Sequence, residues 1–346
     1  MFVGTSTDPA VNLAAEELIF GSIGAGDVHF CVYINGTSVV IGKHQNPWRE
    51  CNIAALKRNN IPVHRRISGG GTVYQDRGNL NFSFLVDRAS FDKMGNLRLV
   101  ARALDRIGIA AVVTGRGDIL VDGYKVSGNA LAIKKERVLH HGTLLVDADL
   151  SGLRGAITGQ PHSDSDGASR RAARPELWTK SIDTHAVRSE PAPVENLSRF
   201  ARGLTIEKVV EIVQAEFAET WGASTTENMI GGVDSGALEA LSERNRSWSW
   251  NFGATPQFEV SFPVSPSGRT IRLRVRDATI DSACCADHPD DSCRLGELLA
   301  GARFASAAIY ERCRGWLNSR KIEDETGKCG EAEITAFAGY VMENQF

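Results

Sequence analysis

The chain has 346 residues, more than one ordinary domain needs and enough for two. Its 42% hydrophobic and 23% charged residues are typical of a folded protein with its own core, and no apolar run approaches the roughly 18 residues of a membrane span. The formal net charge of −3 argues against nucleic acid as the main ligand.

The start, Met1 to Thr5, has neither the charged and apolar regions of a secretory signal nor the Arg- and Ser-rich character of a transit peptide. Seven cysteines are an odd number in a long chain, so we expect free thiols rather than a disulfide framework. The group Cys284, Cys285, His288 and Cys293 does not match paired zinc-ligand spacing, and we interpret it as a loop. We expect no metal to be held by the protein alone.

Helix and strand patterns alternate in the first half of the chain. Apolar residues at helical spacing predict helices over Asn12–Phe20 and Leu97–Ile107. Strands are predicted at Phe30–Ile34, Val39–Gly42, Asn79–Val86 and Thr143–Val146. Apolar and polar residues alternate along the third of these strands, which predicts one buried and one polar face.

In the second half of the chain the regular spacing of apolar residues is first interrupted. Residues Pro161–Pro193 show no periodicity and predict an exposed loop. A helix follows over Ile206–Trp221 with Thr205 as N-cap. A short helix after Gly231-Gly232, strands near Phe258–Phe262 and Thr270–Ile280, and two or three final helices complete an α+β chain. We place a large mixed α/β domain over 1–200 and a smaller α+β domain over 204–346.

Three successive glycines, Gly69 to Gly71, follow the pair Arg65-Arg66. Glycine permits positive φ and a close backbone approach, and consecutive amides in such a turn bind phosphate or carboxylate oxygens. The arginines add fixed positive charge. The sequence contains no G-x-x-x-x-G-K-[ST] pattern, so this is no P-loop. The alternatives are an anion-binding turn of another kind and a flexible connection.

The pair Asp122-Gly123 lies between two strand-like runs and predicts a two-residue β-hairpin turn. The expected pairs are Val121 with Tyr124, Leu120 with Lys125, Ile119 with Val126 and Asp118 with Ser127. Alternation then puts Asp118 and Lys125 on one face, within reach of a shared ligand. The alternative is a lysine exposed on an edge strand.

His140 and His141 are adjacent in a predicted strand. Their side chains point to opposite faces, so they do not chelate one metal together. We expect one packed ring and one that is exposed or hydrogen-bonded.

Long segments in a fixed order resemble the lipoate–protein ligase and lipoyltransferase family. They are NLAAEELIF, VVIGKHQNPWRECN (Val39–Asn52), RRISGGGTVYQDRGNLNFSF (Arg65–Phe84), GRGDILVDGYKVSG (Gly115–Gly128), HHGTLLVDADL (His140–Leu150) and SWSWNFGATPQF (Ser247–Phe258). Together they span most of the chain. The motif set matches the lipoate branch better than biotin ligases.

The resemblance implies a large domain with the mixed sheet of the biotin/lipoyl ligase type, and a smaller C-terminal domain that changes position between half-reactions. It also implies the chemistry. Lipoate attacks the α-phosphate of ATP, in the presence of Mg²⁺, to give lipoyl-AMP and pyrophosphate. An acceptor lysine then takes the lipoyl group and AMP leaves.

Carried over by position, the resemblance assigns Lys125 as the catalytic residue. Nucleotide or lipoyl-AMP binding falls to Arg66, Ser68, Gly69, Gly70, Gly71, Thr72, Val73, Tyr74, Asp118 and Lys125. We expect an apolar slot for the lipoyl tail to be lined by Val40, Phe82 and His141. A preorganised lysine beside phosphate and carbonyl stabilises charge in both steps.

The sequence departs from many relatives at two positions, with Gln75 in place of His and Asn129 in place of Ser or Thr. Gln75 weakens any assignment of a histidine acid or base there. The segments Phe91–Leu104 and Val187–Leu197 resemble the eukaryotic lipoyltransferase branch, which is mitochondrial and uses preformed lipoyl-AMP or a lipoyl-protein donor. The alternative to an ATP-dependent ligase is therefore such a transferase, in the mitochondrial matrix if eukaryotic and otherwise in the cytoplasm.

Two further classes compete with the adenylate route. A thioester-using transferase would need a cysteine near the turn, and the first domain contains only Cys31 and Cys51. A non-catalytic module would bind an acyl-lysine without forming AMP.

The expected partners are the apo lipoyl domains of 2-oxo acid dehydrogenase complexes and the glycine cleavage H protein, which present the acceptor lysine beside acidic residues. We expect no nucleic acid or membrane partner, and a monomer. A basic patch of Lys134, Lys135 and Arg137, with Arg65 near the glycine turn, is a candidate for steering the acceptor; the alternative is a solvated turn.

Overall fold

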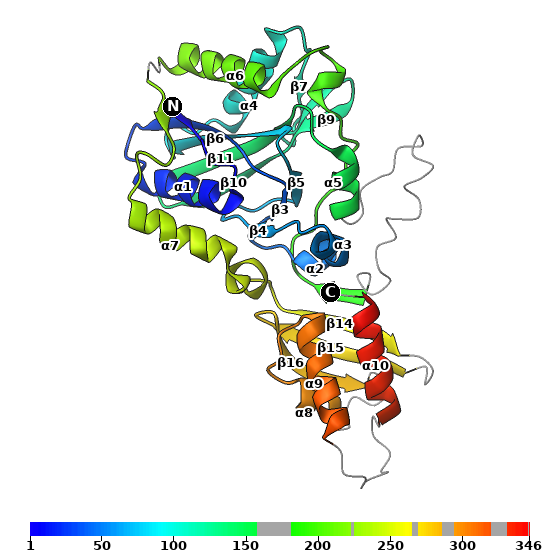
Figure 1. Cartoon of the computed structure of the whole chain (residues 1–346). Coiled ribbons are helices and arrows are strands. Elements are labelled where there is room, and N and C mark those ends of the chain that lie inside the picture. Colours follow the sequence, from blue (N-terminus) through cyan, green and yellow to red (C-terminus); the bar gives the residue numbers. More distant parts are fainter. Residues whose placement is uncertain (158–180, 223–224, 265–268, 286–293, 320–330, 345) are drawn as a thin grey trace. The chain divides into compact units, whose positions relative to one another are not determined.

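The computed structural model describes residues 1–157, 181–222, 225–264, 269–285, 294–319, 331–344 and 346 (Figure 1). These residues form two compact units, each built from segments that are separated in the sequence. The first unit comprises the described residues of Met1–Lys43, Ile61–Ser163 and Ser189–Ser247. The second comprises those of His44–Asn60, Asp164–Arg188 and Trp248–Phe346.

A six-stranded mixed sheet forms the centre of the first unit. Its order is β10 (Asn129–Lys134), β11 (Arg137–Leu145), β6 (Asn79–Asp87), β2 (Val28–Ile34), β1 (Phe2–Val3) and β13 (Glu227–Asn228). The short strand β1 pairs in parallel with both of its neighbours, and the other pairs are antiparallel.

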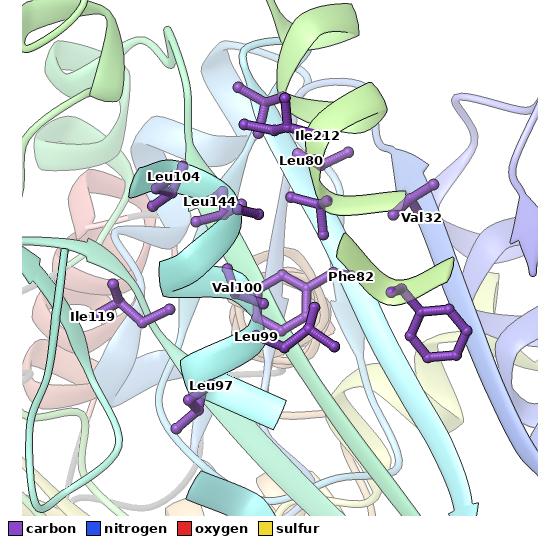
Figure 2. Close-up of a cluster of buried hydrophobic side chains, with 14 of the residues drawn as sticks. Val32, Leu80, Phe82, Leu97, Leu99, Val100, Leu104, Ile119, Leu144 and Ile212 are labelled. Atoms are coloured by element: carbon purple, nitrogen blue, oxygen red, sulfur yellow. The ribbon is translucent and has the colours of Figure 1, made fainter. Parts of the chain in front are cut away.

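Helices cover both faces of this sheet (Figure 1). On one face α4 (Lys93–Asp105) and α6 (Ile206–Trp221) enclose the main apolar core, part of which Figure 2 shows around Phe82. On the other face α1 (Pro9–Ser22) packs on the sheet and α7 (Ser235–Arg246) packs on α1. Burial of the apolar face of each helix supplies most of the driving force for this arrangement.

The long strand β6 is buried along its whole length. The predicted alternation is present, but its polar face lies under α1, because Ser83 donates a hydrogen bond to the Glu16 carboxylate of that helix. Asn81 on the same face accepts a 2.6 Å bond from the Gln75 amide. The polar face is therefore a set of buried, hydrogen-bonded groups.

Two three-stranded sheets complete the strands of the first unit. One has the order β4 (Val63–Arg65), β3 (Ser38–Ile41) and β5 (Val73–Gln75), and the other has β7 (Val112–Val113), β8 (Ile119–Val121) and β9 (Tyr124–Ser127). The glycine-rich segment connects β4 to β5, and β8 and β9 form the predicted hairpin. A further helix, α5, spans Leu150–Ala156.

The second unit contains an antiparallel sheet of β12 (Ile182–Thr184), β14 (Phe258–Val264), β15 (Arg269–Arg276) and β16 (Thr279–Cys285). Its helices are α2 (Pro47–Glu50), α3 (Ile53–Arg58), α8 (Arg294–Leu299), α9 (Ser306–Asn318) and α10 (Glu331–Asn344). Aromatic rings fill its core: Trp48, Phe258 and Phe346 each contact Phe304 within 5.3 Å between centroids.

Helix α6 confirms the predicted helix, since its bounds and the Thr205 cap are as expected. It belongs to the first unit, although we expected residues 204–346 to form one domain. Its buried face meets the central sheet, where Phe217 stacks on Phe30 of β2 at 4.8 Å. The periodicity of a helix shows which face is buried but not which sheet covers it.

Two predictions in the second half need correction. A strand, Ile182–Thr184, lies inside the predicted loop, where it extends the sheet beside β14. The run Thr270–Ile280 is broken by a turn at Asp277-Ala278, both with positive φ, so it contributes to two strands. Residues 158–180 of the predicted loop, and His288 and Cys293, lie outside the described residues.

None of the described helices is both long and apolar enough to span a membrane.

Candidate active site

The glycine-rich turn lies against the end of β3, close enough to exclude side chains at two positions. A Cβ on Gly42 would come within 2.2 Å of the Gly70 carbonyl oxygen. Gly70 itself has a φ of +83°, in the left-handed region that favours glycine. The Lys43 amide donates a 2.8 Å bond to the Ser68 carbonyl and fixes the two segments together.

The buried side chain of Arg66 is hydrogen-bonded to backbone carbonyl groups of the turn. Its Nη2 donates to the carbonyl oxygens of Gly69 and Gly71 at 2.6 and 2.7 Å, and its Nη1 donates to that of Val40 at 3.2 Å. The residue is only 6% exposed. Burial lowers the pKa of Arg66 to about 10, so the guanidinium stays charged at neutral pH. The predicted nucleotide-contacting arginine thus binds the backbone carbonyl groups of the turn.

The amides of Gly70 and Gly71 are left without a hydrogen-bond partner among the described residues. Gly69 donates to the Leu131 carbonyl at 3.3 Å, and Thr72 donates to the Ser189 hydroxyl at 2.9 Å. Gly70 is exposed. Two adjacent amides with no partner, beside a buried guanidinium, suit an anionic oxygen.

The hairpin predicted at Asp122-Gly123 is confirmed, with φ of 49° and 82° at the two turn residues. Leu120 pairs with Lys125 as expected. A bulge between Ile119 and Leu120 then shifts the register, so Ile119 pairs with Ser127 and not with Val126. The predicted pairing of Asp118 with Ser127 is therefore wrong, and Ser127 is buried.

Asp118 and Lys125 nevertheless come together. Lys125 Nζ lies 2.7 Å from Asp118 Oδ1, and the two side chains keep 26% and 30% of their surface exposed. The lysine side chain crosses Gly128, where an added Cβ would lie 3.2 Å from Lys125 Cε. The result is a partly exposed, directed ammonium group that is neutralised by one carboxylate.

Strand β10 brings the hairpin to the glycine turn. It begins at Asn129, directly after the hairpin, and Leu131 accepts the Gly69 amide. A Cβ on Gly70 would lie 3.2 Å from that of Ala130. The Lys125 hairpin and the free amides are therefore held beside one another by backbone contacts.

The sequence analysis missed a segment, Ser189–Glu195, that bridges the two motifs. Ser189 accepts the Thr72 amide at one end. At the other end the Lys125 amide donates to Pro193 at 2.9 Å, and the Glu195 amide donates to Lys125 at 3.2 Å. Its only sequence signal was the resemblance of Val187–Leu197 to the family, because no periodicity marks a backbone bridge of this kind.

The three residues expected to line a lipoyl slot do not share a face. Phe82 lies in the core under α4 (Figure 2), and it pairs with Gly142 of β11. His141 points to the other face, where it meets Glu16 of α1. Val40 belongs to the separate sheet of β3 and pairs with Val73. One slot lined by all three is thus not formed, because neighbouring residues on a strand alternate between faces.

The side chains of Tyr74 and Gln75, in strand β5, contact residues outside the glycine turn. The Tyr74 ring meets Gly152 of α5, and burial with nearby Asp76 and Asp149 raises its pKa to about 12. Gln75 is engaged on both sides of its amide, by Asn35 and Asn81. These side chains position β5 rather than offer an acid or a base.

Asn129, the second departure from the family pattern, links two parts of the site. Its amide nitrogen donates to the Gly117 carbonyl, and its oxygen lies 3.2 Å from His140 Nε2. Burial, with smaller contributions from His141 and Lys93, lowers the pKa of His140 to about 3, so this ring is neutral. We expected one packed ring and one that is exposed or hydrogen-bonded; both rings are buried and both have hydrogen-bond partners.

The cysteines do not suit a thioester route. Cys31 and Cys51 are 0% and 1% exposed. Burial, reinforced by Glu16, raises the pKa of Cys31 well above its usual value, which suppresses the nucleophilic thiolate. Among the described residues no group of three or more His, Cys, Asp or Glu side chains is arranged to hold a metal ion.

The predicted basic patch is smaller than expected. Lys134 and Lys135 are exposed at the end of β10. Arg65 is only 1% exposed and donates to the carbonyls of Gly42 and Lys43, so it is no part of a surface. Arg137 donates to the Ile23 carbonyl.

The family model of the lipoyl protein ligase A/B catalytic domain matches residues 8–218, more than half of the chain. Among solved structures, the chain is similar to LipL1 of P. falciparum in complex with lipoate, with 20% identity and a TM-score of 0.60 over 99% of this chain and 98% of that one. It is also similar to a bipartite lipoate protein ligase of Thermoplasma acidophilum, solved with its E2 lipoyl domain, with 24% identity and a TM-score of 0.55 over 73% and 96%. A lipoate-protein ligase A bound with ATP gives 24% identity and a TM-score of 0.55 over 73% and 98%. These likenesses confirm the predicted lipoyl-ligase fold.

Gly70→Ala tests the conformation of the turn. The left-handed φ and the 3.0 Å approach of the added Cβ to Arg66 Nη2 should lower the free energy of unfolding. We expect a loss of about 1–2 kcal/mol by denaturant titration, and weaker binding of pyrophosphate by calorimetry. Gly69→Ala is the matched control, since its Cβ meets nothing within 4 Å and its φ is ordinary. Equal stability and equal affinity in the two variants would show that the turn is not held as described.

Proposed function

The chain belongs to the family of the lipoyl protein ligase A/B catalytic domain, and from that membership we propose that it is an ATP-dependent lipoate–protein ligase. The observation that carries the proposal is the juxtaposition of Lys125 with the glycine turn. An ammonium group and two free amides lie on adjoining backbone segments, joined through β10. Such a set fits an acyl-adenylate, which has one phosphate and one activated carbonyl.

In the first step a lipoate carboxylate oxygen attacks the α-phosphorus of ATP, and the bond to the bridging oxygen breaks to release pyrophosphate. Negative charge builds on the phosphate oxygens. We infer that the amides of Gly70 and Gly71 and the Lys125 ammonium stabilise this charge. Asp118 would supply a carboxylate oxygen to a Mg²⁺ ion bound with ATP, and that ion would add positive charge beside the phosphates.

In the second step the acceptor amine attacks the lipoyl carbonyl of lipoyl-AMP. An amide bond forms, the carbonyl–phosphate bond breaks, AMP leaves with the electron pair, and the amine loses a proton. Lys125 is placed to stabilise the developing oxyanion. Asp118 affects this step as well, because its carboxylate competes with a ligand phosphate for the Lys125 ammonium. The ion pair keeps the lysine directed at the site before the ligand arrives.

The second candidate is a transferase that uses preformed lipoyl-AMP or a lipoyl-protein donor. The resemblance of Phe91–Leu104 and Val187–Leu197 to the transferase branch favours it. The two routes differ in whether pyrophosphate is released. With ATP, Mg²⁺, lipoate and an apo lipoyl domain, the ligase releases pyrophosphate as the acceptor gains mass, whereas the transferase modifies the acceptor only when given lipoyl-AMP or a lipoyl-protein donor.

The acceptors that we propose are apo lipoyl domains, with the H protein of glycine cleavage as a further candidate. The bipartite ligase of T. acidophilum was solved with such a domain, which supports this class of partner. Lys134 and Lys135 at the exposed end of β10 offer positive charge for an acidic surface. Lys134 is the last residue of β10, the strand that adjoins the glycine turn, and Lys135 follows it.

Lys125→Ala tests the catalytic assignment. With lipoyl-AMP supplied, transfer to the acceptor should fall by at least about a hundredfold, because one preorganised charge is lost. Stability should change by less than about 0.5 kcal/mol, since the side chain is partly exposed and its loss opens no core cavity. Lys208→Ala, which removes another ion-paired lysine, is the control. Wild-type transfer by Lys125→Ala would refute the assignment.

The double variant Lys134→Glu/Lys135→Glu tests the acceptor surface. We expect a KM for the lipoyl domain raised about tenfold at low salt, converging with wild type as salt screens the charges. Arg202→Glu/Lys208→Glu makes the same change in net charge at exposed positions near α6, and should leave this KM unchanged. A KM that moves equally in both variants would attribute the effect to net charge, and one that moves in neither would remove the surface from recognition.

A further inference from the structure

A buried carboxylate lies behind the glycine turn and is connected to it. Glu16 of α1 is 1% exposed and faces His141 Nδ1 at 3.0 Å through Oε2. The hydroxyls of Tyr33 and Ser83 donate to its other oxygen. None of these contacts was anticipated from the sequence, where the first helix offered only its apolar spacing.

The connection continues from His141 to the turn. His141 Nε2 lies 2.6 Å from Ser68 Oγ, and Ser68 Oγ accepts a 2.9 Å bond from Arg66 Nε. Arg66 then binds the carbonyls of Gly69 and Gly71. An unbroken series of hydrogen bonds therefore runs from helix α1, through strand β11, to the segment whose amides are free.

We propose that Glu16 is a positioning residue for the glycine turn, acting through His141 and Ser68 to fix the Arg66 guanidinium and so the free amides of Gly70 and Gly71. The inference rests on the proposed function only for the identity of the ligand.

The charge of Glu16 determines which atom donates and which accepts in each hydrogen bond of this series. Burial raises the pKa of Glu16, but His141 and the donors Ser83 and Tyr33 outweigh burial and lower it below the usual value, so the group is a carboxylate at neutral pH. A carboxylate at Nδ1 favours the tautomer with its proton there. Nε2 then accepts the Ser68 O–H, which leaves the Ser68 lone pairs for Arg66 Nε–H.

The order carboxylate, imidazole and hydroxyl is also that of a serine nucleophile with its base. Two observations exclude that role for Ser68. Its side chain is 0% exposed, and its oxygen is engaged by Arg66 as well as by His141. The geometry therefore serves orientation rather than attack.

A purely structural alternative is that Glu16 only attaches α1 to the sheet. Tyr33→Phe separates the two possibilities, because it removes one hydrogen bond to Glu16 and leaves the His141 contact in place. Glu16→Gln keeps the shape and removes the charge that selects the tautomer. A structural role predicts similar effects of the two variants on stability and none on the turn.

The first test uses the full chain without any ligand. Nitrogen NMR should report the Nδ1–H tautomer of His141 in wild type and in Tyr33→Phe, and a shift toward Nε2–H in Glu16→Gln. Exchange of the hydrogen-bonded amides of Gly69 and Thr72 should accelerate about tenfold in Glu16→Gln alone, as one charge-assisted hydrogen bond behind the turn is weakened. An unchanged tautomer and unchanged exchange at the turn would overturn the proposal, whatever the protein binds.

A double-mutant cycle tests the path. Glu16→Gln should raise the Kd for Mg-ATP, or for lipoyl-AMP if ATP does not bind wild type, about tenfold by calorimetry. In a Ser68→Ala background the same change should have almost no further effect, because the series is already broken. A full tenfold effect in that background would show that Glu16 does not act through Ser68. A wild type that binds neither nucleotide would refute the proposed function and leave the tautomer and exchange results to decide this inference.

Discussion

The bonds from the Arg66 guanidinium to the carbonyls of the glycine turn are the constraint on which the site depends. A run of three glycines has little conformational preference of its own and loses much entropy when it is fixed. A buried cation that binds the carbonyls of Gly69 and Gly71 offsets that cost and orients the peptide planes. Within the part of the chain that the structure describes, the amides of Gly70 and Gly71 have no hydrogen-bond partner. Positive charge thus acts on the ligand site from behind the backbone.

The second half of the site is held by a different means. Lys125 lies in a hairpin whose turn is determined locally, and its side chain is directed by Asp118 at 2.7 Å. Strand β10 and the bridge Ser189–Glu195 connect the hairpin to the turn through hydrogen bonds of the backbone and of the Ser189 hydroxyl. Most of these connections are made between main-chain atoms, and the Ser189 hydroxyl supplies the contact with Thr72, so the backbone of the hairpin is fixed relative to the turn. A preorganised arrangement of this kind is what stabilises charge that develops on two centres in turn.

Local features of the site were predictable from the sequence, and non-local ones were not. Asp122-Gly123 specifies its own turn, and Thr205 with the apolar face of Ile206–Trp221 specifies a helix. The bulge at Ile119 has no such signal, since an extra residue in one strand depends on what the other strands require. The direction of Arg66, the role of Glu16 and the bridge at Ser189 arise from contacts between distant segments. The resemblance identified the family correctly, but it did not indicate that Arg66 faces the backbone or that Phe82 and His141 lie on opposite faces.

The most direct test of the account is hydrogen–deuterium exchange of the wild-type protein with and without a non-hydrolysable lipoyl-AMP analogue. The account predicts slower exchange at the amides of Gly70 and Gly71 and across residues 124–129 when the analogue is bound, with the strands β14, β15 and β16 unchanged. Binding detected by calorimetry without protection at the glycine turn would contradict it, because the free amides would then not be the site that holds the adenylate.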